Sequence, residues 1–196
     1  MGESAVPRSG SRWGPGTPYL RAGAAIAGSL ILLVGLGSSA PPSFAAVKLG
    51  QTQESYLCAA KADLIQSRAK EVSYAAPSTG RLTQWQINGG ADAGTVRFEV
   101  WRPKSGNDYK LVYIGPKTNL VAGNVKRVDL SPNVHVRTGD VIGLRTHTQA
   151  DCAFQTHSST DTTLARTGQP APVIGSTYTF SSAPPGFLLN IAASFS

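Results

Sequence analysis

The sequence predicts an all-β protein, an antiparallel two-sheet sandwich of the jelly-roll type that is tied by one disulfide. Eight or nine short apolar stretches carry the two-residue alternation of strands, and clusters of Gly, Pro, Ser and Asn separate them. The chain also holds two cysteines, Cys58 and Cys152, both beyond an N-terminal export signal. The remaining 151 residues, 46–196, are enough for one domain, so we expect a single one.

Residues 1–45 are predicted to be a signal peptide. Three arginines precede an uncharged apolar run of fifteen residues, Ala22 to Leu36, which is the order of regions in secretory signals. This run is shorter than the roughly 20 residues that span a bilayer. Small residues end the segment Ser43-Phe44-Ala45, which places the cut before Ala46. The alternative is an uncleaved membrane tether, the only membrane contact that we expect.

The first part of the mature chain contains a short strand, 47–52, and an alanine-rich segment, 55–70. The periodicity of the second segment fits either one face of a helix or a loop held by the disulfide. Alternating apolar residues then predict strands at 72–76 and 83–87, with a turn at Ser78-Thr79-Gly80 between them.

The clearest strand is 95–101, with one buried and one solvent-exposed face. The two sets are Val96, Phe98 and Val100 on the buried face, and Arg97, Glu99 and Trp101 on the exposed one. Further strands are expected at 109–114, 125–130, 134–136, 141–146, 152–156, 178–180 and 187–195. A long surface loop is expected at 157–175. The last strand is apolar on both sides near its start, which predicts a place in the middle of a sheet.

The charge of the mature chain is mildly basic. Removing residues 1–45 takes three of the 18 basic and one of the 11 acidic residues, which leaves 15 and 10 and a net charge of +5. Lys126-Arg127 is the only adjacent basic pair. Proteins that read nucleic acids carry a denser basic stripe interleaved with aromatic residues, so we expect no nucleic-acid partner.

Cys58 and Cys152 are expected to form a disulfide, because the exported part of the chain meets oxidising conditions. A bond that closes a loop of this length stabilises a protein by about 4 to 5 kcal/mol in the chain-entropy account. Two buried free thiols are the alternative.

Several turn and strand signatures carry a resemblance. They are Gly50-Gln51-Thr52, Cys58, Ser73-Tyr74 with Pro77, Gly80 with Leu82 and Trp85, Val96 to Arg102, Tyr109 to Val112, and Gly139 to Leu144. This succession resembles a group of secreted bacterial β-sandwich proteins, common in actinobacteria, that lack an assigned function. The resemblance covers most of the mature domain. It implies the fold, and it supplies no reaction and no functional residues.

No arrangement of residues predicts catalysis or metal binding. His147, Asp151 and His157 lack the spacing of a zinc site, and Gly139-Asp140 fits a turn better than a catalytic carboxylate. Serine occurs in no nucleophile elbow, and no pair of carboxylates stands out as a glycosidase pair. We therefore expect no metal, no cofactor and no enzymatic activity.

Trp101 is the candidate binding residue, because it shares the expected solvent face with Arg97. Together with Arg102 and Lys110 these residues would form an apolar plate surrounded by cations, which suits the face of a sugar ring. The alternative for Trp101 is packing at the rim of the core.

Three functions remain. The first is a noncatalytic, secreted binding module for a cell-surface or extracellular polymer, such as a cell-wall polysaccharide. The second is a structural or adhesive exoprotein with protein partners. The third is a secreted hydrolase.

Overall fold

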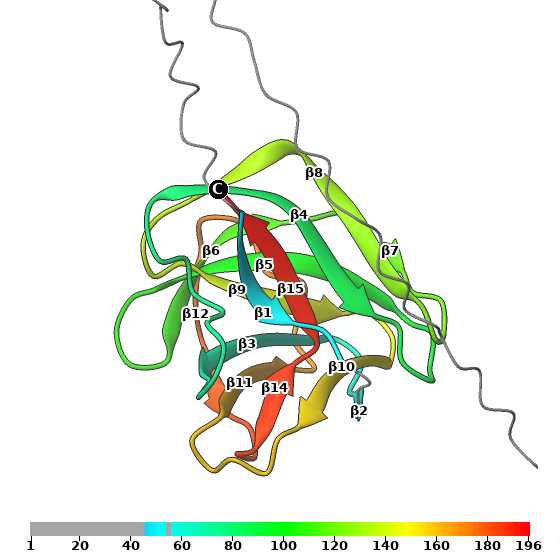
Figure 1. Ribbon diagram of the computed structural model, residues 1–196. Helices are drawn as coiled ribbons and strands as arrows, with labels where there is room; N and C mark the ends of the chain where they lie inside the picture. The colour runs from blue at the N-terminus through cyan, green and yellow to red at the C-terminus, as the bar shows by residue number, and fades with distance from the viewer. Residues whose placement is uncertain (1–45, 54–55) are drawn as a thin grey trace, which may run out of the picture. The chain divides into compact units, whose positions relative to one another are not determined.

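The computed structural model describes residues 46–53 and 56–196, so the expected signal segment lies outside the described residues. Every regular element of the described part is a β-strand, which confirms the all-β prediction (Figure 1). Within these ranges there is accordingly no helix able to cross a membrane. The strands are β1 (Val47–Gln51), β2 (Tyr56–Cys58), β3 (Ala62–Arg68), β4 (Gly80–Asn88), β5 (Thr95–Pro103), β6 (Asp108–Ile114), β7 (Thr118–Asn119), β8 (Val125–Val136), β9 (Val141–Thr146), β10 (Ala150–Gln155), β11 (Thr162–Thr167), β12 (Thr177–Thr179), β13 (Ser181–Ser182), β14 (Phe187–Leu189) and β15 (Ile191–Phe195).

Three antiparallel sheets organise these strands. A four-stranded sheet has the order β1-β15-β4-β8, and a three-stranded sheet has the order β14-β10-β2. The largest sheet has the order β12-β6-β5-β9-β3-β11-β13, with the short β7 added to β5. The expected last strand, 187–195, is two strands. Strand β15 lies between β1 and β4, as expected, whereas β14 lies at one end of the three-stranded order.

The largest sheet curls until its two ends meet. Tyr178 lies in β12 near one end of the strand order, and Arg166 lies in β11 near the other. The guanidinium carbon of Arg166 is 4.4 Å from the centre of the Tyr178 ring. The arrangement is therefore a nearly closed barrel with smaller sheets beside it, rather than the two matched sheets of a jelly-roll sandwich.

The outer face of the barrel packs against the four-stranded sheet. Trp85 of β4 stacks on Phe98 of β5, with ring centroids 5.5 Å apart. Val96 and Val100 are buried on the same side of β5 as Phe98, as the alternation predicted. This apolar layer is the main core of the molecule.

The alanine-rich segment 55–70 is neither helix nor loop in its described part, since it contributes β2 and β3. Strand β3 pairs with β9 on one side and β11 on the other, so it is a central strand. Its residues 62–66 are all buried, because both of its faces are covered. A strand covered on both faces loses the alternation by which a sequence reveals it. The expected loop 157–175 likewise contains β11.

The expected disulfide is present and joins Cys58 to Cys152. Its Cα atoms are 5.8 Å apart, which is a normal separation for a disulfide. The bond lies within the three-stranded sheet, where β2 pairs with β10 and Cys58 is the register partner of Ala150. It thereby fixes an N-terminal strand to one that follows much later in the chain.

Candidate functional site

Trp101 lies in the interior of the barrel, so the prediction of an outward tryptophan is wrong. Its side chain has no exposed surface. The indole Nε1 donates a hydrogen bond to Oε2 of Glu99 at 2.9 Å. The edges of Tyr178 and Phe180 contact the ring, with centroids 6.0 and 5.0 Å away. The alternation correctly placed Trp101 on the same face of β5 as Glu99. This face is covered, however, by Tyr178 and Phe180, which follow β11 in the chain.

The three cations expected around Trp101 do not form a plate with it. Arg102 donates from Nε and Nη2 to the two carboxylate oxygens of Asp140, at 2.8 and 2.7 Å. Asp140 also accepts a hydrogen bond from the backbone N–H of Arg137 at 2.8 Å, which confirms its role in the turn before β9. Lys110 is the register partner of Arg102 on β6. The predicted sugar-binding face is therefore absent at this place.

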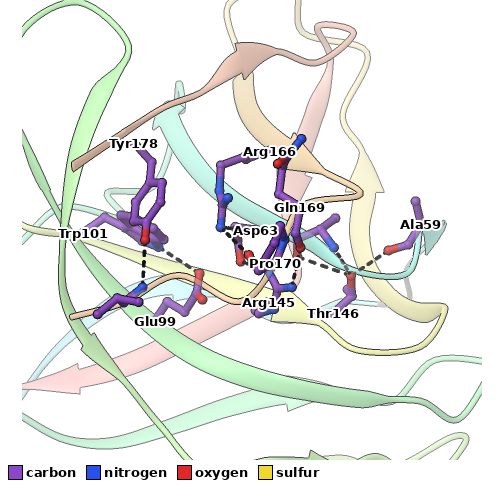
Figure 2. Close-up of polar contacts among 12 residues, drawn as sticks. Ala59, Asp63, Glu99, Trp101, Arg145, Thr146, Arg166, Gln169, Pro170 and Tyr178 are labelled. Atoms are coloured by element: carbon purple, nitrogen blue, oxygen red, sulfur yellow. Dashed lines mark hydrogen bonds and ion pairs between the residues drawn. The ribbon is translucent and has the colours of Figure 1, made fainter. Parts of the chain in front are cut away.

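The barrel interior holds a cluster of charged side chains that the sequence did not reveal (Figure 2). Asp63 lies between Arg145 and Arg166 and forms an ion pair with each, at 2.5 Å. The side chain of Asp63 is fully buried, and those of Arg145 and Arg166 are 3% and 11% exposed. The cluster thus connects β3 with its two neighbours, β9 and β11.

Glu99 adds a second buried carboxyl group beside this cluster. Burial raises its pKa well above the ordinary 4.5, and the negative charge of Asp63 raises it further. The hydrogen bond from Trp101 and the charge of Arg145 act in the opposite direction but are smaller. A carboxyl group in these surroundings stays protonated at pH values where an exposed glutamate is ionised.

The loop after β11 covers the cluster and forms hydrogen bonds with two of its side chains. Arg145 donates from Nη2 to the carbonyl of Gln169 at 2.9 Å, and Arg166 donates from Nη2 to the carbonyl of Pro170 at 3.0 Å. The guanidinium of Arg166 also covers the Tyr178 ring. Because the two carboxyl groups are enclosed, this cluster cross-links the barrel and offers no surface to a substrate.

An open groove lies elsewhere on the surface, where two hollows adjoin. Their volumes are about 730 and 640 Å³, and they share Lys70, Glu71 and Thr160. The first is lined by residues 66–75, Val141 and Thr160. The second is lined by Gln51, Gln53, Lys70, Glu71, residues 154–161 and Leu188. Most lining residues carry hydroxyl, amide or charged side chains, while the first hollow exposes more apolar than polar surface and the second more polar than apolar.

A hydrogen bond of the buried Asp161 links the two segments that line this groove. Asp161 is 2% exposed. It accepts from the backbone N–H of Lys70 at 2.8 Å and from the hydroxyl of Thr156 at 2.5 Å. Within the segment 66–75, Gln66 donates from Nε2 to the carbonyl of Arg68 at 2.7 Å. The groove is thus preformed, which lowers the entropy cost of binding.

The histidines provide no metal site in the described part of the chain. Across residues 46–53 and 56–196, no three His, Cys, Asp or Glu side chains gather in a way that could hold a metal ion. His157 lines the groove, whereas His147 follows β9 and bonds through its backbone N–H to the carbonyl of Thr95 at 2.8 Å.

Comparison with known proteins returns no relative. No protein family, no curated protein and no solved structure matches the chain.

Proposed function

We propose that this protein is an exported, noncatalytic binding module for a cell-surface or extracellular polymer such as a glycan. The observation that carries the proposal is the open groove, in which two hollows continue into each other at Lys70, Glu71 and Thr160. We therefore propose that the binding residues are those of this groove and not those around Trp101.

The chemistry of the lining favours a polar chain molecule. Pockets for small drug-like molecules are enclosed and mainly apolar, with few polar groups. This groove is instead open and lined by polar side chains, among them Gln53, Arg68 and Ser158. Sugar hydroxyls both donate and accept hydrogen bonds, so successive units of a glycan find partners along such a groove.

Export is part of the proposal. The disulfide between Cys58 and Cys152 fits an oxidising compartment outside the cytoplasm. The signal segment 1–45 is proposed to be removed before Ala46, which leaves the binding module in the medium or at the cell surface.

The test uses mature protein recovered from culture medium, whose N-terminal residue should be Ala46. Retention on insoluble cell-wall polysaccharide is measured for the wild type and for Lys70→Ala, Glu71→Ala and Thr160→Ala. All three side chains are exposed, so the melting temperature should change by no more than a few degrees. Each variant should lose about three- to tenfold in affinity, the value of one or two hydrogen bonds.

Lys104→Ala is the matched control, since Lys104 is exposed and lies outside the groove. Equal retention of all variants and the control would overturn the groove assignment. Self-association at rising concentration, without retention on any polysaccharide, would favour the structural exoprotein instead. Turnover in a hydrolase panel would favour the third function.

A further inference from the structure

A second polar surface lies in the seam between β7 and β8. It is a shallow hollow of about 440 Å³ that is lined by Lys117, Thr118, Asn119, Lys126, Arg127 and Val128. Three of these six residues are cationic and none is acidic. The seam shares no residue with the groove proposed above.

The strand register places further positive side chains next to Lys117. Strand β7 pairs with β5 through Val96 and Thr118, so Lys117 continues toward Arg97 along the antiparallel ladder. Arg97 is in turn the register partner of Arg145 on β9. His147 follows the last residue of β9. Arg97, Arg145 and His147 are therefore neighbours of Lys117 on the barrel side of the sheet, whereas Lys126 and Arg127 lie on β8.

His147 lies among the same positive side chains. Burial lowers its pKa below the ordinary 6.5, and Lys117, Arg145 and Arg97 lower it further. Asp63 is the one acidic group that acts in the opposite direction, and it has the smallest effect. The charges that face His147 are thus mainly cationic.

The cations of the seam lack acidic partners in the described part of the chain. The ion pairs among the described residues are formed by Arg102, Arg145 and Arg166, none of which lines the seam. Arg127 donates only to the amide oxygen of Gln86, at 3.3 Å. Nε of Arg97 and Nε2 of His147 are buried, and neither meets a hydrogen-bond partner among the described residues. Buried nitrogen atoms without partners are rare in proteins, so water or a ligand group fits beside these two, which lie near Lys117 on the barrel side of the sheet.

We propose that this seam, formed by Lys117, Lys126 and Arg127, binds the carboxylate groups of an acidic polysaccharide. The hollow is open and spreads its cations over β8 and the segment before β7, which suits a chain with repeated negative charges better than a single small anion. A nucleic acid is less suited, because no aromatic side chain lines the seam to stack on a base.

Alginate oligosaccharides serve as the probe, because they are polymers of uronic acids, and neutral dextran serves as the uncharged comparison. Binding by mature protein is measured by calorimetry at low salt for the wild type and for the double variant Lys117→Gln, Lys126→Gln. Both side chains are exposed and neither enters an ion pair in the described structure. The double variant should lose about tenfold in affinity, and the wild type should bind more weakly as salt is added.

The matched control is the double variant Lys48→Gln, Lys104→Gln, which removes the same charge from exposed positions outside the seam. It should stay within about twofold of the wild type. Equal losses in both double variants would show that net charge alone attracts alginate and would overturn the proposal. Absence of alginate binding would overturn it as well, and so would equally tight, seam-dependent binding of single-stranded DNA.

His147 gives an independent readout by nuclear magnetic resonance. A carboxylate placed near its imidazole favours the protonated form, so bound alginate should raise the pKa of His147. An unchanged His147 titration at saturating alginate would place the ligand elsewhere. Lys70→Ala should leave alginate binding intact, so failure of the seam and failure of the groove give different results.

Discussion

A buried tryptophan needs an acceptor for its indole N–H and side chains that pack against its ring, and Trp101 has both. Its N–H finds an acceptor in Glu99, and its ring is contacted edge-on by Tyr178 and Phe180. Edge-to-face aromatic pairs contribute about 0.5 to 1.5 kcal/mol each beyond the burial of area. Trp101 is therefore a main contributor to the barrel interior.

Replacing Trp101 by alanine should destabilise the protein strongly. A buried tryptophan truncated to alanine costs about 3 to 5 kcal/mol, which lowers the melting temperature of a domain of this size by about 10 °C or more. Thermal and urea unfolding measure the change. Val173→Ala is the control, since Val173 is 63% exposed and its truncation should cost less than about 0.5 kcal/mol. A Trp101→Ala variant as stable as this control would contradict the buried position.

The sequence predicts the burial of a residue correctly where the alternation within one strand is enough to determine it. The alternation in β5 placed Val96, Phe98 and Val100 in the core, as the structure shows. It also placed Trp101 and Glu99 together. It did not show that their face is covered, because the covering residues come from β12 and the segment after it, far along the chain. The open groove was missed because hydroxyl and amide side chains in loops give no distinctive pattern.

At the scale of elements, β3 shows why some strands escape recognition. It carries Asp63 and Gln66 among apolar residues and is buried on both faces. The carboxylate of Asp63 is paired with arginines, and Gln66 Oε1 accepts from the backbone N–H of Leu189 at 3.0 Å. Polar residues in a central strand are stable only with such partners. The partners come from distant strands, so sequence periodicity cannot supply them.

The disulfide stabilises the smallest sheet and the loop that it closes. Cys58 and Cys152 are separated by 94 positions, and β2 has only three residues of its own. The double variant Cys58→Ala, Cys152→Ala should lose about 4 kcal/mol of unfolding free energy, measured by urea denaturation. The reduced wild type should lose a similar amount, which separates the covalent bond from the packing of the sulfur atoms. A loss below about 1 kcal/mol in both samples would show that β2 and β10 hold together without the bond.

At the scale of the whole molecule, the two faces of the largest sheet contact different surroundings. Its outer face joins the apolar layer around Trp85 and Phe98, and its inner face encloses aromatic and charged side chains. The all-β class and the disulfide follow from the sequence. The near closure of the barrel does not, because it depends on the meeting of Arg166 and Tyr178 at the two ends of the strand order.

The enclosed Glu99 makes the stability of the whole molecule depend on pH. Its pKa in the folded state lies well above the ordinary 4.5, first because of burial and then because of Asp63. In the unfolded chain the group regains its ordinary value. The folded state therefore holds the proton more tightly, and the free energy of unfolding should fall as pH rises above about 4.5. The slope is about 1.4 kcal/mol per pH unit until the folded-state pKa is reached, and it is zero below both values.

Glu99→Gln removes this titration while it keeps an oxygen that accepts the hydrogen bond from Trp101. Urea unfolding of both proteins between about pH 5 and pH 8 should show the stability of the variant rising relative to the wild type as pH increases. All other titrating groups are common to the two proteins, so the difference isolates Glu99. Asp63→Asn is the contrasting variant, because it leaves the buried Arg145 and Arg166 without their counter-ion and should cost about 3 to 5 kcal/mol. If the unfolding free energies of the wild type and Glu99→Gln change with pH in parallel, Glu99 titrates as it does in water. The enclosed position of Glu99 in the barrel would then be wrong.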